Sequence, residues 1–281
     1  MSTVVRQYGK AGKAGKAGGA VSPRAGKPIQ SVDRAASILE ALASGPRRLG
    51  VTDISERLGL ARPTVHGLLQ TLRAHGFVEK HAESDKYQLG PGLLYLGASY
   101  LDISELRSRS IIFAETLAQR VNAAVRVGIL HRNAVLVIHH VFKPDAAFQV
   151  LEVGAELPIH ATALGKALLA FGTPELLADV TAEPLPKLTR ATLTAAALKR
   201  ELANIRRAGV AEERDEAVLG ESSLAAPVFD RDARAIGAIG IVGETEALTA
   251  GAAASAYPGE VADAAAGLSR ELGAPRGLPG A

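Results

Sequence analysis

Residues 52–89 constrain the fold most, because two helical patterns are followed there by two short strand patterns. The segment TDISERLG (52–59) has apolar residues four apart, a threonine able to cap its start and a glycine able to end it. After a short turn, RPTVHGLLQTLRAHG (62–76) has a proline suited to the first helical turn, an apolar stripe and a closing glycine. FVEK (77–80) and KYQL (86–89) then read as strands around a polar turn. Together these patterns predict a winged helix-turn-helix.

A further helix is predicted just before this segment. SVDRAASILEALASG (31–45) places Val32, Ala36, Leu39 and Ala43 on one helical face, Ser31 or Asp33 can cap its start, and a Gly-Pro pair ends it. Three helices and a wing over residues 29–90 form a small DNA-binding domain.

The face of 62–75 opposite the apolar stripe is polar and carries a glycine. A glycine within a helix costs about 1 kcal/mol relative to alanine, and close approach of the backbone to a DNA groove is one reason to keep it. Gln70 can pair with adenine, and Thr64 can reach a phosphate or a base edge. An ordinary solvated helix face is the alternative. The predicted DNA-binding residues are Arg62, Thr64, His66, Gly67, Gln70, Thr71, Lys80 and Lys86.

The N-terminal residues 1–28 are predicted to be a disordered basic tail. The first 30 residues carry six basic side chains and no acidic one, so a chain of net charge +3 leaves +3 − 6 = −3 for the remainder. The run GKAGKAGKAGG has no apolar periodicity and cannot bury enough surface to fold. The tail is either a solvated appendage or an arm for DNA phosphates.

Composition excludes several classes of protein. The chain has 281 residues and no cysteine, so it has no disulfide framework and no thiolate zinc site. No apolar run approaches the roughly 20 residues that span a bilayer. We therefore expect a cytoplasmic protein with no membrane partner.

Residues 91–104 are predicted to form a linker helix, and 105–272 a second domain. A Gly-Pro-Gly break precedes two helical patterns, and a helix with little else to contact often pairs with its own copy, which suits two half-sites on DNA. Strand patterns follow at AVRVGIL, AVLVIHHV, FQVLEV, SSLAAPVF and AIGAIGIVG, with helices near 162–171, 174–180, 194–208 and 259–272. This order predicts an α+β domain with an antiparallel sheet, followed by a flexible C-terminus over 273–281.

An ordered set of motifs now resembles one known family. SVDRAASILEAL, TVHGLLQTL, GFVEK with YQLG, LPIHATALGKALLA and AAPVFD are similar to segments of the IclR family of bacterial transcription regulators. SYLDISELR, HHVF and QVLEVGA further resemble the glycerol-operon regulators within it. The resemblance implies a winged helix-turn-helix, a linker helix and a GAF-like domain that binds a small effector.

The segment LPIHATALGKALLA (157–170) is interpreted as a pocket wall. It lacks the spacing of a phosphate-binding loop, but Thr162 can cap a helix whose first N–H groups would anchor a small anion. His160 is predicted to be structural, and Lys166 to lie on the outer face or to pair with an acid. With positions that the resemblance implies, the predicted effector-binding residues are Thr162, Ala163, Leu164, Glu213, Ser223, Gly240 and Val242.

We find no catalytic residues, metal ligands or cofactor site in the sequence. No nucleophile lies in a pattern with a base, and the adjacent His139 and His140 point to opposite faces of a strand. The prediction is a homodimer or dimer of dimers that binds an operator and represses a catabolic operon, with glycerol or glycerol phosphate as candidate effector. The alternatives are an activator of an aromatic or organic-acid operon, an enzyme using the C-terminal domain, and a nucleoid protein that binds DNA without sequence preference.

Overall fold

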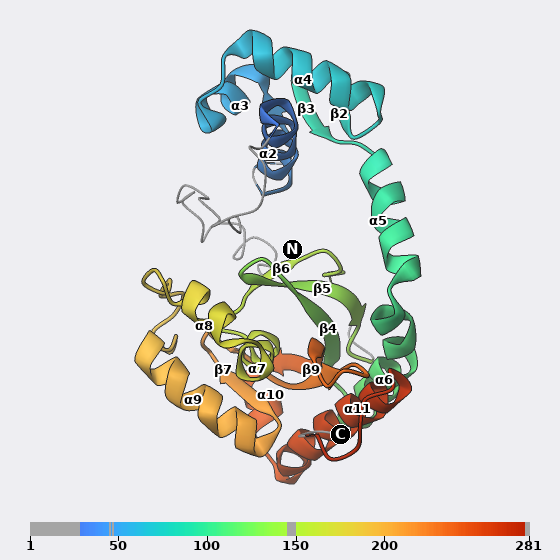
Figure 1. The fold of residues 1–281 in the computed structure, drawn as a ribbon, viewed down its shortest axis with the longest axis vertical. Helices are drawn as coiled ribbons and strands as arrows, with labels where there is room; N and C mark the ends of the chain where they lie inside the picture. Colours follow the sequence, from blue (N-terminus) through green and yellow to red (C-terminus); the bar gives the residue numbers. More distant parts are fainter. Residues whose placement is uncertain (1–28, 45, 47, 145–149, 279–281) are drawn as a thin grey trace. The chain divides into compact units, whose positions relative to one another are not determined.

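The computed structural model describes residues 29–44, 46, 48–144 and 150–278 (Figure 1). The described chain divides into two compact units between Ile103 and Ser104, and each unit is considered by itself. The basic tail at 1–28, the residues 145–149 and the last three residues lie outside the described residues.

The first unit is a winged helix-turn-helix, as predicted. Its elements are α2 (Gln30–Ser44), β1 (Leu49–Gly50), α3 (Val51–Leu58), α4 (Arg62–Ala74), β2 (Val78–Lys80) and β3 (Lys86–Leu89). The strands form an antiparallel sheet in the order β1-β3-β2. The two-residue strand β1 was not predicted, because so short a segment has no periodicity. Side chains of all three helices and of the sheet share one core, which includes the apolar stripe of α4.

Three local predictions in this unit are wrong. Neither Ser31 nor Asp33 caps α2, because the helix already begins at Gln30. The face of α2 marked by Val32 is not its buried face: Val32 is 63% exposed, and Ile38 and Leu42 enter the core instead. Apolar residues occur on more than one side of α2, and the side with the larger residues packs into the core. Thr52 does not cap α3, because the helix begins at Val51 and the Asp53 carboxylate accepts the Gly50 N–H at 2.9 Å.

Helix α5 (Gly92–Ile103) follows the wing and is apolar yet exposed. Leu94 is 76% exposed and Tyr95 is 74% exposed. The next helix, α6 (Glu105–Val121), opens the second unit and is capped by Ser104, whose hydroxyl accepts the Arg107 N–H.

A six-stranded antiparallel sheet forms the centre of the second unit. Its strands are β4 (Ala124–His131), β5 (Ala134–Val141), β6 (Glu156–Pro158), β7 (Ala211–Arg214), β8 (Glu221–Phe229) and β9 (Ala235–Glu244), in the order β6-β5-β4-β9-β8-β7. The predicted strand at 148–153 is wrong for its described part, since residues 150–154 are irregular and form a turn. Val150 and Leu151 are exposed there, while Glu152 is buried.

Helices cover both faces of this sheet. α7 (Ala163–Phe171), α8 (Pro174–Val180) and α9 (Ala195–Ala208) belong to one face, and α6 and α11 (Tyr257–Glu271) to the other (Figure 1). The short helices α10 (Thr245–Thr249) and η1 (Ala252–Ala256) join β9 to α11. Gly237 of β9 allows α6 to lie close to the sheet, because a Cβ there would stand 2.5 Å from the Leu106 side chain of α6.

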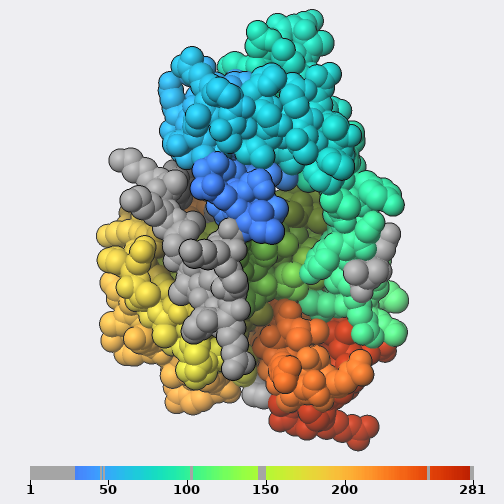
Figure 2. All heavy atoms as spheres, turned by 45° about the horizontal axis from the view of Figure 1, so that its top comes forward, coloured from blue at the N-terminus to red at the C-terminus, as the bar shows by residue number. Residues whose placement is uncertain are grey.

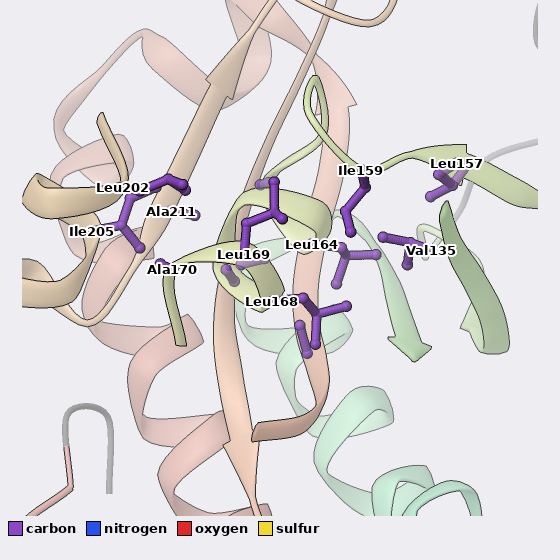
Figure 3. Close-up of a cluster of buried hydrophobic side chains, with 14 of the residues drawn as sticks. Val135, Leu157, Ile159, Leu164, Leu168, Leu169, Ala170, Leu202, Ile205 and Ala211 are labelled. Carbon is purple, nitrogen blue, oxygen red and sulfur yellow. The ribbon is translucent and has the colours of Figure 1, made fainter. Parts of the chain in front are cut away.

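Helix α7 is the centre of the main core. Apolar side chains from α7, α9 and the strands converge on it, as Figure 3 shows for Leu164, Leu168 and Leu169. Gly165 allows the helix to lie close to the preceding chain, since a Cβ there would stand 2.1 Å from the Ile159 carbonyl oxygen. This close approach places the first turn of α7 against the sheet.

Candidate DNA-binding surface and effector pocket

The predicted DNA-binding residues of α4 lie on the sides of the helix away from its buried residues Val65, Leu69 and Leu72. Figure 2 draws the first unit, which contains α4, in blue to cyan. Arg62, His66, Gln70 and Thr71 are exposed, and Thr64 is half-buried. Gly67 is also exposed, and a Cβ there would meet nothing within 4 Å. Packing inside the chain therefore does not require this glycine.

The wing adds cationic side chains. Lys80 and Lys86 are exposed, and Lys80 Nζ lies 2.6 Å from Asp85 Oδ1. The hydrogen bond to Asp85 raises the pKa of Lys80. An exposed pair of this kind is weak, so a phosphate can compete for the lysine. Arg73 was not among the predicted DNA-binding residues, yet it is exposed in the last turn of α4, three residues after Gln70.

In the second unit, four predicted effector residues meet at the start of α7. Thr162 caps the helix, because its hydroxyl accepts the Gly165 N–H at 3.3 Å. The Ala163 N–H donates to Ser223 Oγ at 3.3 Å, and Ser223 Oγ donates to Glu213 Oε2 at 2.7 Å. A backbone N–H from the first turn of α7, a hydroxyl of β8 and a carboxyl group of β7 are thus joined in one chain of hydrogen bonds.

Glu213 is the buried acid of this group. It is 2% exposed, and burial raises its pKa to about 7, against the opposing effect of the hydrogen bonds from Ser223 and from the backbone of Glu216 and Ala217. The carboxyl group therefore exchanges its proton near neutral pH. In its protonated form it is a hydrogen-bond donor as well as an acceptor.

The remaining predicted effector residues complete a small closed cavity. Its volume is about 10 Å³, roughly the room that one water molecule needs. Gly240 contributes only backbone, because a Cβ would stand 2.3 Å from the Leu224 carbonyl oxygen. Glu213 lies behind Ser223 and is not part of the wall. The predicted residues that line the cavity are Thr162, Ala163, Leu164, Ser223, Gly240 and Val242.

The sequence analysis missed a buried charge cluster beside this cavity. Arg126, on β4, is 6% exposed, and its Nε and Nη2 atoms both contact the Glu152 carboxylate, with 2.9 Å between Nη2 and Oε1. Its Nη1 lies 3.6 Å from Glu221 Oε1. Arg126 also lines a second cavity of about 350 Å³ with Glu152 and Glu221. The signal in the sequence was a single arginine within the otherwise apolar strand AVRVGIL.

The other two predictions for LPIHATALGKALLA concern Lys166 and His160. Lys166 is 1% exposed and its Nζ lies 2.6 Å from Glu216 Oε1, so the pairing with an acid is confirmed and the outer-face alternative is wrong. The reason is that α7 has the sheet on one side and α9 on another. His160 Nε2 donates to the Pro186 carbonyl at 3.0 Å, and burial lowers the pKa of His160, as fits a structural role.

Within the described residues, no three side chains of His, Cys, Asp or Glu form a group that could hold a metal ion. His140 Nδ1 instead accepts the Glu152 N–H at 3.2 Å. Of the helices in the described ranges, none has the length and apolar character needed to cross a membrane.

Comparison with known proteins gives a consistent result for both units. The model of the IclR helix-turn-helix domain matches residues 31–82, and that of the bacterial transcriptional regulator IclR C-terminal domain matches residues 98–270. The chain is 48% identical to the glycerol operon regulatory protein of Streptomyces griseus over 250 residues, which are 88% of this chain and 98% of that one.

Solved structures agree with this result. An IclR transcriptional regulator from Alicyclobacillus acidocaldarius has a TM-score of 0.77 and 26% identity, over 86% of this chain and 98% of its own. An IclR homologue from Microbacterium hydrocarbonoxydans, solved in complex with 4-hydroxybenzoate, has a TM-score of 0.71 and 25% identity, over 86% and 98% of the two chains.

Proposed function

The chain belongs to the IclR family of bacterial transcriptional regulators, and on that premise we propose that it represses a catabolic operon and leaves its operator when a small effector binds the second unit. The observation that carries the proposal is the presence of two separate sites in one chain. One is the exposed polar face of α4, and the other is the buried polar group at the start of α7.

The DNA-binding role is assigned to residues on α4 and the wing. Gln70 and Thr64 would read base edges, while Arg62, Lys80 and Lys86 would contact phosphates. We assign residues 29–90 to the DNA-binding domain, 91–104 to the linker helix and 105–272 to the effector-binding domain. As a regulator of this kind the protein would act in the cytoplasm and turn over no substrate.

Glycerol or glycerol phosphate is the proposed effector, because the Streptomyces griseus relative is a glycerol operon regulatory protein. The 10 Å³ cavity must open for either molecule, or join the neighbouring cavity of 350 Å³. The second candidate function is an activator of an aromatic or organic-acid operon. The aromatic-acid effector of this alternative is favoured by the 4-hydroxybenzoate bound to the Microbacterium hydrocarbonoxydans homologue.

A homodimer, or a dimer of two dimers, is the proposed assembly. Leu94 and Tyr95 of α5 leave a large apolar surface exposed, and Val32 of α2 is exposed as well. Large apolar side chains left exposed on a helix favour contact with a second copy, and two copies would present two α4 helices to two half-sites.

The test is footprinting of the promoter beside the protein's own gene, with and without glycerol and glycerol 3-phosphate. We expect a protected site with two half-sites, lost when one of the two compounds is added. Gln70→Ala should weaken protection, while Gln119→Ala, an exposed glutamine of α6 in the second unit, should not. A protein that binds random DNA equally well, or that converts either compound into a product, would contradict the proposal.

A further inference from the structure

We propose that Arg126 is the recognition residue for an anionic effector, and that the Glu152 carboxylate is its internal substitute. A ligand with a carboxylate or phosphate group would replace Glu152 on the arginine. The proposal rests on the proposed function, because it names the chemical class of the effector and the residue that binds it.

The geometry of the pair is that of ligand recognition. Nε and Nη2 of Arg126 each face one oxygen of Glu152, so the planar guanidinium binds the carboxylate through two parallel contacts. This bidentate arrangement suits carboxylates and phosphates and sets arginine apart from lysine. Glu221 stands farther away, at 3.6 Å from Nη1. Glu152 therefore holds the position that an anionic ligand would take.

The place of Arg126 in the fold supports a ligand-binding role. The arginine lines both the 350 Å³ cavity and the small cavity at the start of α7. The larger volume lies in the range of small-molecule sites, about 300–1,000 Å³. From this one anchor, a ligand can extend toward the Ala163 N–H, Ser223 and, behind it, Glu213, which are the polar groups of the predicted effector site.

For a ligand to replace Glu152, the glutamate side chain would rotate away from Arg126 while its backbone stays in place. The Glu152 N–H donates to His140 Nδ1 at 3.2 Å, and its carbonyl accepts the Ala155 N–H at 2.8 Å. These two bonds hold the backbone while the carboxylate turns toward the larger cavity, which it already lines.

Charge determines which ligands can make the exchange. Removing the nearer carboxylate of a buried arginine destabilises a protein, and Glu221 is the more distant partner at 3.6 Å, so an anion can replace Glu152 at lower cost than a neutral group. An uncharged polyol would have to bind with the Arg126–Glu152 pair intact. The affinity for an anion should therefore depend on the charge of Glu152, and the affinity for a polyol should not.

The experiment is calorimetric titration of the full-length protein with glycerol 3-phosphate, glycerate and glycerol. Glu152→Gln removes the competing charge and keeps the shape, so we expect at least one anion to bind at least tenfold more tightly and glycerol to be unaffected. Glu156→Gln is the matched control, because Glu156 is an exposed glutamate four residues away. The double variant R126Q/E152Q removes both charges of the Arg126–Glu152 pair and should lose the anion binding.

Operator binding is measured on the same samples, which separates this inference from the proposed function. Wild-type protein that binds no operator would contradict the proposed function. Intact operator binding together with equal anion affinities in the wild type, E152Q and E156Q would overturn the proposed role of Arg126 but not the proposed function. The proposed role of Arg126 would also be overturned if E152Q tightened glycerol binding as much as anion binding, or if no anion bound any of these proteins.

Discussion

Replacing Glu213 by glutamine should change how the stability of the second unit depends on pH. The carboxyl group is buried beneath Ser223, and its pKa is raised from the ordinary value of 4.5 to about 7. Between these two values the unfolded chain loses the proton while the folded chain keeps it. The unfolded state then binds fewer protons, so the free energy of unfolding falls as the pH rises and the loss is complete above pH 7.

The magnitude follows from the gap between the two pKa values. Each pH unit is worth about 1.4 kcal/mol, so the gap amounts to about 3 kcal/mol. Glutamine resembles the protonated acid: its carbonyl can accept the Glu216 N–H, and its amide can donate to Ser223. We therefore expect Glu213→Gln to match the wild type near pH 4.5 and to be more stable by about 3 kcal/mol at pH 8.

Urea unfolding of the two proteins between pH 4.5 and 8.5, followed by circular dichroism, measures this difference. Burial lowers the pKa of His139, His140 and His160, so these groups reduce stability as the pH falls. They do so in both proteins, and the difference between variant and wild type cancels them. Glu212→Gln, an exposed neighbour on β7, should leave the profile unchanged. Parallel profiles for Glu213→Gln and the wild type, or a gap that widens at low pH, would refute the reasoning.

Four further predictions concern the DNA-binding surface, the tail and the core. Gln70→Ala should lower operator affinity by about 1–3 kcal/mol and leave affinity for random DNA unchanged, as competition binding would show. Gly67→Ala should raise helix stability by about 1 kcal/mol, since a Cβ meets nothing there, yet weaken operator binding if the backbone approaches the groove. Lys166→Met leaves Glu216 buried without its cation and should destabilise the protein by about 3–5 kcal/mol in urea unfolding, with partial recovery on adding Glu216→Gln. Removal of residues 1–27 should make the salt dependence of DNA binding shallower, and an unchanged slope would mean that the tail does not contact phosphates.

The sequence by itself determined the elements that depend on neighbouring residues. Gly59, with φ of +65°, ends α3, and Pro63 lies in the first turn of α4. Thr162 caps α7 as its position in the sequence predicted. Caps, turns and apolar periodicity act over a few residues of one segment, so they can be recognised without knowing what the segment contacts. The ordered motifs likewise identified the family, although the DNA-binding and effector residues remain predictions.

The tertiary structure decided which faces are buried and which charges meet. Val32 and Ile38 are both apolar residues of α2, and only packing against α3, α4 and the sheet selected Ile38. Lys166 became a core residue because α7 is enclosed by the sheet and α9.

Arg126 and Glu152 are 26 residues apart, and no local pattern joins them. They meet because the Glu152 backbone bonds to His140 of β5, and the Glu152 side chain reaches Arg126 on the neighbouring strand β4. The size of a cavity is likewise a property of several packed elements, so the sequence could name residues around the effector site but could not show that its cavity holds about one water molecule. Long-range contacts of this kind depend on how the elements pack, and the sequence of any one segment does not contain that information.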